Sequence, residues 1–134
     1  MSLIKEIHLK TYAYISFTDI SNQIKDFVKS SNILNGIILV YTPHTTAGIT
    51  VNENADPSVM TDITKFISKK FPHENYFTHF EGNSPSHIMS SLFSASETFI
   101  INEGEIILGQ WQGIYFCEFD GPRSRKIILK IIKE

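Results

Sequence analysis

Three histidines in this chain are spaced so that folding can bring their rings together. His44 follows Pro43 at the mouth of an expected strand. His79 and His87 lie on either side of a short Glu-Gly-Asn-Ser-Pro loop that can fold back on itself. A catalytic zinc site uses three protein ligands and leaves a fourth position open. The spacing therefore allows a three-histidine zinc site, although a histidine in a threonine-rich strand is more often structural.

A second polar cluster begins at Asn52 and ends at Pro57, where a strand is expected to lead into a helix. Asp56 before Pro57 is typical of a helix N-cap followed by proline in the first turn. Glu53 has no such capping role, so it is a candidate to orient a metal-bound histidine or to act as an acid or base. Asn52 beside it is a candidate substrate-binding amide.

The chain's one tryptophan lies between two glutamines and two glycines in the segment 109–113. Alternation places Gln112 on one face of an expected strand and Trp111 on the other, where it packs in the core or contacts a ligand. Glu118 shares the face of Gln112. Six residues of extended strand separate them by about 20 Å, so only a bend would bring both to one site.

The only two arginines, Arg123 and Arg125, come together after 52 residues without any lysine or arginine. That cation-free stretch, 71–122, holds seven acidic residues and three of the five histidines. Two guanidinium groups two residues apart in an extended segment face the same way, and together they match a phosphate or pyrophosphate. Surface charge at a strand entrance is the alternative.

Composition limits the classes of protein to which this chain can belong. With 134 residues, 42% of them hydrophobic, it forms one domain over residues 1–134. Its net charge of −2 predicts no nucleic-acid partner, and the absence of a long apolar run predicts no membrane partner. One cysteine, Cys117, is typical of the reducing cytoplasm.

Hydrophobic periodicity predicts the elements that must position these residues. Helices are expected from Asp19 to about residue 31, over 57–70, and from Ser84 to about residue 93. Strands are expected over 5–17, 36–41, 44–52, 76–80, 98–102, 106–119 and 125–132, the last three as a meander. The long segment 106–119 predicts a bend at Gly109 or Gly113. The fold class is α+β, one largely antiparallel sheet or half-barrel with two or three helices on one face.

Several of these motifs, in the same order along almost the entire chain, resemble the YjbQ family. The motifs are His-Thr-Thr-Ala at 44–47, Asn52-Glu53, Asp56-Pro57, His79, His87, Leu-Gly-Gln-Trp-Gln at 108–112, Glu118-Phe119 and Arg123-Ser124-Arg125. The resemblance implies a small α+β domain that assembles as a homotrimer, with a polar pocket and a metal on the histidines. It also implies a secondary thiamine-phosphate synthase activity.

Together, the residues and the resemblance predict a metal-dependent pocket that acts on a phosphorylated small molecule. His44, His79 and His87 would hold a divalent metal, Zn²⁺ or, with a pyrophosphate substrate, Mg²⁺. The expected catalytic residues are Glu53, Gln112 and Glu118. The expected substrate-binding residues are Asn52, Trp111, Arg123 and Arg125. The alternatives are a zinc-dependent hydrolase and a trimer that binds a metal or a phosphorylated metabolite without turnover.

Overall fold

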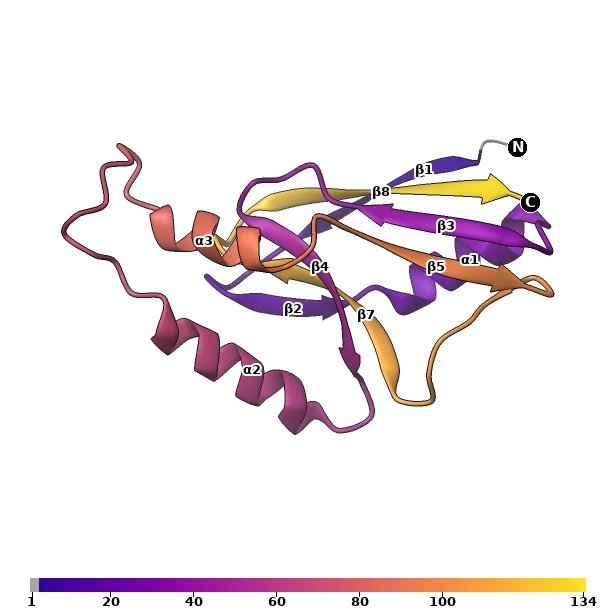
Figure 1. Ribbon diagram of the computed structural model, residues 1–134, viewed down its shortest axis with the longest axis horizontal. Coiled ribbons are helices and arrows are strands. Elements are labelled where there is room, and N and C mark those ends of the chain that lie inside the picture. Colours follow the sequence, from indigo (N-terminus) through magenta and orange to yellow (C-terminus); the bar gives the residue numbers. More distant parts are fainter. Residues whose placement is uncertain (1–2) are drawn as a thin grey trace.

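Residues 3–134 are described by the computed structural model, in which two antiparallel sheets are combined with three helices (Figure 1). The larger sheet has the order β1-β8-β3-β5-β6, and the smaller sheet has the order β2-β7-β4. The strands are β1 (Ile4–Lys10), β2 (Ser16–Asp19), β3 (Gly36–Tyr41), β4 (Ala47–Glu53), β5 (Ser96–Asn102), β6 (Glu105–Ile106), β7 (Gln112–Glu118) and β8 (Ser124–Lys133). The predicted α+β class with a largely antiparallel half-barrel sheet is confirmed, and the structure adds a second, smaller sheet that was not predicted.

The three helices form close to where the sequence predicts them. They are α1 (Ser21–Ser31), α2 (Pro57–Lys70) and α3 (Ser84–Leu92). Asp56 caps α2 as expected, because its Oδ1 accepts a hydrogen bond from the Ser58 amide at 2.9 Å. The N-cap position of α3 is Asn83, one residue before the expected Ser84. None of the helices within residues 3–134 has the length and apolarity needed to cross a bilayer.

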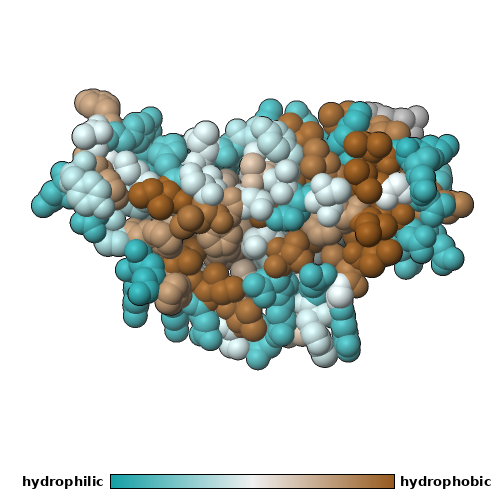
Figure 2. Space-filling model, in the orientation of Figure 1, coloured by the Kyte–Doolittle hydropathy of each residue, from teal (hydrophilic) through white to brown (hydrophobic). Residues whose placement is uncertain are grey.

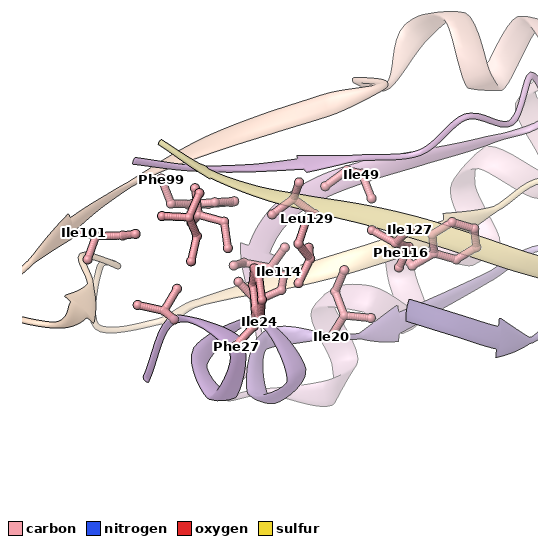
Figure 3. Packing of buried hydrophobic residues seen from close by; sticks show 14 of the residues in the cluster. Ile20, Ile24, Phe27, Ile49, Phe99, Ile101, Ile114, Phe116, Ile127 and Leu129 are labelled. Carbon is pink, nitrogen blue, oxygen red and sulfur yellow. The ribbon is translucent and has the colours of Figure 1, made fainter. Parts of the chain in front are cut away.

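The main core lies between the inner faces of the two sheets and α1 (Figure 3). Ile24, Phe27 and Val28 line the buried face of α1, and Ile20 is buried at its N-cap position. Alternate residues of each strand fill the remaining space, such as Phe116 of β7 and Leu129 of β8, both fully buried. The inner faces of β7 and β8 therefore both contribute to this core.

A smaller core packs α2 and α3 against the opposite face of β7. It contains Ile67 of α2, Met89 of α3 and Cys117 of β7. Phe66 of α2, in contrast, is 60% exposed. Only Ile67 of that helix is fully buried, so α2 presents much of its apolar side chain surface to solvent.

Three predicted strands differ from the structure. The segment 5–17 is divided, because residues 11–15 cross from the larger sheet to the smaller one. The segment 106–119 is also divided, and the break at 107–111 contains Gly109, one of the two expected bend positions. Residues 76–80 form a loop without strand pairing. The predicted terminal meander is wrong, because β7 joins the smaller sheet while β5 and β8 belong to the larger one.

Candidate functional site

A polar cleft of about 290 Å³ opens at one end of the main core. Its walls come from the β3–β4 loop, the start of α3, and the turn that links β7 to β8. The lining residues are Pro43, His44, Thr45, Thr46, Glu81, Asn83, His87, Asp120, Arg123 and Arg125. Four residues that the sequence singled out, His44, His87, Arg123 and Arg125, therefore reach one cleft.

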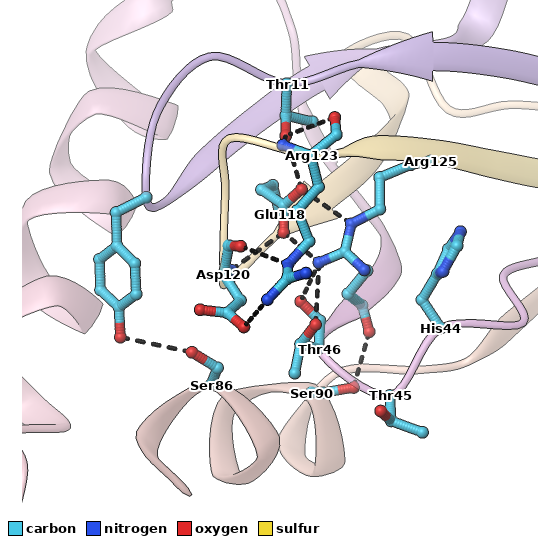
Figure 4. Close-up of polar contacts among 12 residues, drawn as sticks. Thr11, His44, Thr45, Thr46, Ser86, Ser90, Glu118, Asp120, Arg123 and Arg125 are labelled. Atoms are coloured by element: carbon cyan, nitrogen blue, oxygen red, sulfur yellow. Dashed lines mark hydrogen bonds and ion pairs between the residues drawn. The ribbon is translucent and has the colours of Figure 1, made fainter. Parts of the chain in front are cut away.

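Arg125 lies at the floor of the cleft and forms a buried ion pair with Glu118 (Figure 4). Nε of Arg125 donates to Glu118 Oε1 at 2.8 Å, and Nη2 donates to Glu118 Oε2. Nη2 also donates to the hydroxyl of Thr46 at 2.8 Å. Glu118 accepts further hydrogen bonds from the Thr11 hydroxyl at 2.6 Å and from the Asp120 amide at 2.9 Å. These contacts fix the guanidinium plane.

The ion pair continues the inner faces of β7 and β8. Glu118 follows Ile114 and Phe116 on the core face of β7, and Arg125 precedes Ile127 on the core face of β8. The pair therefore closes the end of the apolar core with polar groups that satisfy one another. Glu118, expected as a catalytic residue, is fully buried and does not line the cleft.

Arg123 occupies the rim of the same cleft. Its Nη2 donates to Asp120 Oδ2 at 2.8 Å, and its Nε donates to the carbonyl of Asp120 at 2.8 Å. Asn83 holds Asp120 from the other side, with Nδ2 donating to Oδ2 at 2.9 Å. The remaining amide oxygen of Asn83 is buried without a hydrogen-bond partner among residues 3–134. An unsatisfied acceptor beside the cleft is suited to a ligand donor or a cation.

Charge and burial set the protonation of the cleft carboxylates. Burial alone would raise the pKa of Glu118, but hydrogen bonds from Arg125 and Thr11 outweigh it and hold that pKa below its ordinary value. Burial also opposes the charged form of Asp120, yet hydrogen bonds from Asn83 and Arg123 lower its pKa. Both carboxylates are therefore ionised at neutral pH.

Two of the three predicted metal-ligand histidines lie together. The ring centroids of His79 and His87 are 5.1 Å apart, with nearly perpendicular planes. Nδ1 of His87 contacts the carbonyl of Thr45 at 3.2 Å, which leaves its Nε2 free to bind another group. His87 also lines an adjoining open hollow of about 620 Å³, of which His79 forms another wall.

His44 reaches the cleft from the β3–β4 loop and has a different partner. Its Nε2 accepts a hydrogen bond from the backbone amide of Lys126 at 3.0 Å. Within residues 3–134, no group of three or more histidine, cysteine, aspartate or glutamate side chains is placed to hold a metal ion. The three-histidine site therefore stays a prediction. Two of its three residues, His79 and His87, lie close together in the structure.

The other predicted site residues lie at the opposite end of the β4–β7 ladder. Asn52 and Glu53 end β4, and Gln112 pairs with Glu53 at the start of β7. Because β7 is continuous from Gln112 to Glu118, about 20 Å separates this group from the cleft within one chain. Trp111 lies beside the group with 55% of its surface exposed.

Glu53 has a local structural role at the start of α2. Its Oε2 accepts a hydrogen bond from the Asp56 amide at 3.2 Å, just before α2 begins. The expectation that Glu53 takes no part in capping is therefore wrong. Gln112 also makes a local hydrogen bond to the backbone, because its Oε1 accepts from the Gly109 amide at 2.7 Å.

Three polar residues of the site were not singled out by the sequence. Thr11, Asn83 and Asp120 hold or line the arginines, yet each occupies an ordinary strand, loop or turn position. Asp120 alone carried a usable signal, since it lies three residues before Arg123 in a tight turn. Thr11 is brought in by a contact with Glu118, 107 residues away in the sequence, and Asn83 by a contact with Asp120, 37 residues away.

Comparison with known proteins gives consistent matches along the chain. The family model described as UPF0047 protein YjbQ-like matches residues 5–134. The chain is 48% identical over 132 residues to a UPF0047 protein of Methanocaldococcus jannaschii, covering 98% of this chain and 96% of that one. It is 44% identical to the UPF0047 protein YugU of Bacillus subtilis, covering 97% and 99% respectively.

Solved structures agree with the fold. A crystal structure from Clostridium acetobutylicum, described as an uncharacterized conserved protein of the YjbQ/UPF0047 family, has a TM-score of 0.91 and 51% identity, covering 96% of this chain and 99% of that chain. A protein of unknown function from Sulfolobus solfataricus also has a TM-score of 0.91, at 31% identity, covering 98% and 96%. The arrangement of sheets and helices is shared at both levels of identity.

Proposed function

Because this chain belongs to the YjbQ-like UPF0047 family, whose function is not established, we propose that its polar cleft binds the phosphate or pyrophosphate group of a small molecule. The observation that carries this proposal is the convergence of Arg123 and Arg125 on one cleft with His44 and His87. Guanidinium and imidazole N–H groups are the donors that proteins use for phosphate oxygens.

The charge balance of the cleft supports a divalent cation as part of the ligand. Two arginines are offset by the carboxylates of Glu81, Asp120 and, behind them, Glu118. A bare pyrophosphate would therefore meet no net positive charge in the cleft, whereas a pyrophosphate bound to a divalent cation would bring its own counter-charge. His79 and His87 are the side chains suited to Zn²⁺, and phosphate oxygens suit Mg²⁺. When bound, such a cation would neutralise charge on a leaving pyrophosphate.

Within this proposal, thiamine-phosphate synthase chemistry is the specific reaction. A pyrimidine-methyl carbon loses pyrophosphate as its carbon–oxygen bond breaks, and the ring nitrogen of a thiazole phosphate bonds to that carbon. Arg123 and Arg125 would bind the departing pyrophosphate and stabilise its developing charge. Arg125 is suited to this task because Glu118 and Thr46 already hold its guanidinium in place.

Assembly into a homotrimer belongs to the same proposal. Asn52, Glu53, Trp111 and Gln112 are too far from the cleft to serve it within one chain. In a trimer, these residues of one copy would reach the cleft of a neighbouring copy. Trp111, half of whose surface is exposed, is suited to contact either that copy or its ligand.

Calorimetric titration with inorganic pyrophosphate in the presence of MgCl₂ tests the proposal. We expect Arg123→Lys to weaken binding by about tenfold, because a lysine point charge cannot reproduce two directed N–H bonds. Lys133→Gln, at the far end of β8, is the control for loss of distant charge. Absence of heat with the parent protein, with or without Mg²⁺ or Zn²⁺, would contradict the proposed function.

A further inference from the structure

The hydrogen bond between His44 and the Lys126 amide fixes which ring nitrogen carries the proton. Strand β3 last pairs with β8 at Tyr41 and Ile128, so Lys126 lies beyond the end of the ladder. Its amide donates to His44 Nε2 at 3.0 Å instead. A backbone amide can only donate, so Nε2 must present its lone pair and carry no proton.

The other ring nitrogen of His44 is therefore a donor. An imidazolium ring would carry a proton on Nε2, so the contact with the Lys126 amide requires the neutral ring. Burial and the nearby charge of Arg125, which lower the pKa of His44, favour the same form. In a neutral imidazole whose Nε2 is an acceptor, Nδ1 carries the hydrogen. His44 then has no free lone pair for a metal ion, and it does not fit the expected three-histidine site.

His87 has the opposite arrangement. Its Nδ1 faces the carbonyl of Thr45, which can only accept, so Nδ1 is the protonated nitrogen and Nε2 holds the lone pair. This is the arrangement usual for metal-binding histidines, with a carbonyl behind the ring. The two histidines of the cleft therefore offer different groups: an N–H from His44 and a lone pair from His87.

Arg125 presents a second free donor next to His44. Its Nε and Nη2 bond to Glu118 and Thr46, and Nη1 makes no hydrogen bond among residues 3–134. The imidazole of His44 lies beside this guanidinium in Figure 4, and both side chains line the cleft. No acceptor of the described chain satisfies either the His44 Nδ1–H or Arg125 Nη1.

We infer that the Nδ1–H of His44 and Nη1 of Arg125 form a paired donor site for phosphate oxygens, and that His44 binds the anion instead of the metal. The inference rests on the proposed function and deepens it by dividing the cleft. Its His44–Arg125 side takes the phosphate oxygens, and its His79–His87 side faces any accompanying cation. A ligand with a terminal phosphate or pyrophosphate fits this division.

Nitrogen NMR of the histidine rings tests the tautomer directly. In the parent protein, His44 should give a pyrrole-type Nδ1 signal and a pyridine-type Nε2 signal at neutral pH. Inorganic pyrophosphate should shift the Nδ1 signal. Zn²⁺ alone should shift the ring signals of His79 and His87 and leave those of His44 in place. A pyridine-type Nδ1, or a direct response of His44 to Zn²⁺ alone, would overturn the inference.

Two substitutions separate the donor of His44 from its acceptor. His44→Gln carries its amide at the distance of Nε2, so it can accept from Lys126 but lacks the donor at Nδ1. His44→Asn carries its amide at the distance of Nδ1, so it keeps that donor and loses the acceptor. We expect pyrophosphate affinity to fall by about tenfold in His44→Gln, with a melting temperature close to that of the parent.

His44→Asn should show the reverse, a lower melting temperature with affinity near that of the parent. His8→Gln, on the exposed face of β1, is the control for loss of a histidine. Parental affinity in His44→Gln, when the parent protein binds pyrophosphate, would overturn the inference alone. Failure of the parent to bind pyrophosphate would overturn the proposed function and, with it, the anion role of His44.

Discussion

At the scale of single residues, the buried pair of Glu118 and Arg125 links stability to the site. Sequence spacing placed Arg125 beside Arg123 and marked both as anion-binding. It could not show that Glu118 would be the partner of Arg125, because that contact depends on which faces of β7 and β8 meet. The pair leaves one guanidinium nitrogen free for the cleft while its other nitrogens are satisfied.

We expect Glu118→Gln to lower the free energy of unfolding at pH 7 by about 3–5 kcal/mol, because it leaves Arg125 buried without its counter-charge. The pKa of Glu118 is held below its ordinary value of 4.5 in the folded protein. Its charge-dependent stabilisation is therefore complete above that value and is lost as the pH falls through the folded pKa. Urea unfolding from about pH 7 to pH 3 should show the difference between parent and variant shrinking at the acidic end.

Glu105→Gln is the matched control, because Glu105 is exposed on β6 and makes no ion pair among the described residues. It should change the free energy of unfolding little at any pH. A Glu118→Gln variant as stable as the parent at pH 7 would contradict a stabilising role for the buried pair. So would a difference that stays constant down to the acidic limit.

At the scale of elements, local signals predicted helices better than strand partners. Hydrophobic periodicity and the Asp56-Pro57 start located α1 and α2 closely. Apolar alternation cannot report where a chain changes sheets, so it predicts a continuous strand through the crossing at 11–15. For the same reason, alternation did not predict the division between β6 and β7, where only Gly109 indicated a bend.

The turn between β7 and β8 packs against that crossing segment, and Gly121 makes the approach feasible. A Cβ at Gly121 would overlap the carbonyl oxygen of Ala13 and lie 3.0 Å from the Thr11 hydroxyl. We expect Gly121→Ala to cost about 1–3 kcal/mol in the free energy of unfolding, because backbone must move to accommodate the methyl group. It should also displace Thr11 from Glu118.

Gly109→Ala provides the comparison. Its added Cβ would meet the end of the exposed Gln112 side chain at 3.2 Å, and that side chain can shift into solvent with the loss of only one exposed hydrogen bond, from the Gly109 amide. Chemical denaturation of both variants measures the difference. Equal stability of Gly121→Ala and the parent protein would show that the turn and the crossing segment are not held in close contact.

At the scale of the whole molecule, the order of helical and strand patterns predicted an α+β domain but not the division into two sheets. Which strand pairs with which depends on long-range contacts, and a short turn between β7 and β8 misleadingly suggests that they pair with each other. The ten phenylalanines, five tyrosines and one tryptophan are more large aromatic side chains than one small core can easily bury. Several of them, such as Phe66, Tyr76 and Phe80, remain largely exposed in the single chain.

The outer face of the larger sheet also carries exposed apolar residues. Ile37 of β3 pairs directly with Ile100 of β5 and with Ile132 of β8, so the three form a row across neighbouring strands. Ile100 and Ile132 are 57% and 52% exposed. Figure 2 shows hydrophobic side chains gathered at the end of the molecule where the two termini lie in Figure 1. Apolar rows of this kind are typical of association surfaces.

We therefore expect sedimentation equilibrium of the purified protein to give about three times the chain mass of 15.3 kDa. Ile100→Asp should shift the distribution towards the monomer, because it places a charge in the middle of the isoleucine row. Leu92→Asp, at the exposed end of α3, introduces the same charge away from that row and should leave the assembly unchanged. A parent protein that sediments as a single monomeric species at micromolar concentration would refute the trimer. A trimer that both variants leave intact would place the contact between copies elsewhere, because a carboxylate cannot be buried against isoleucine without a counter-charge.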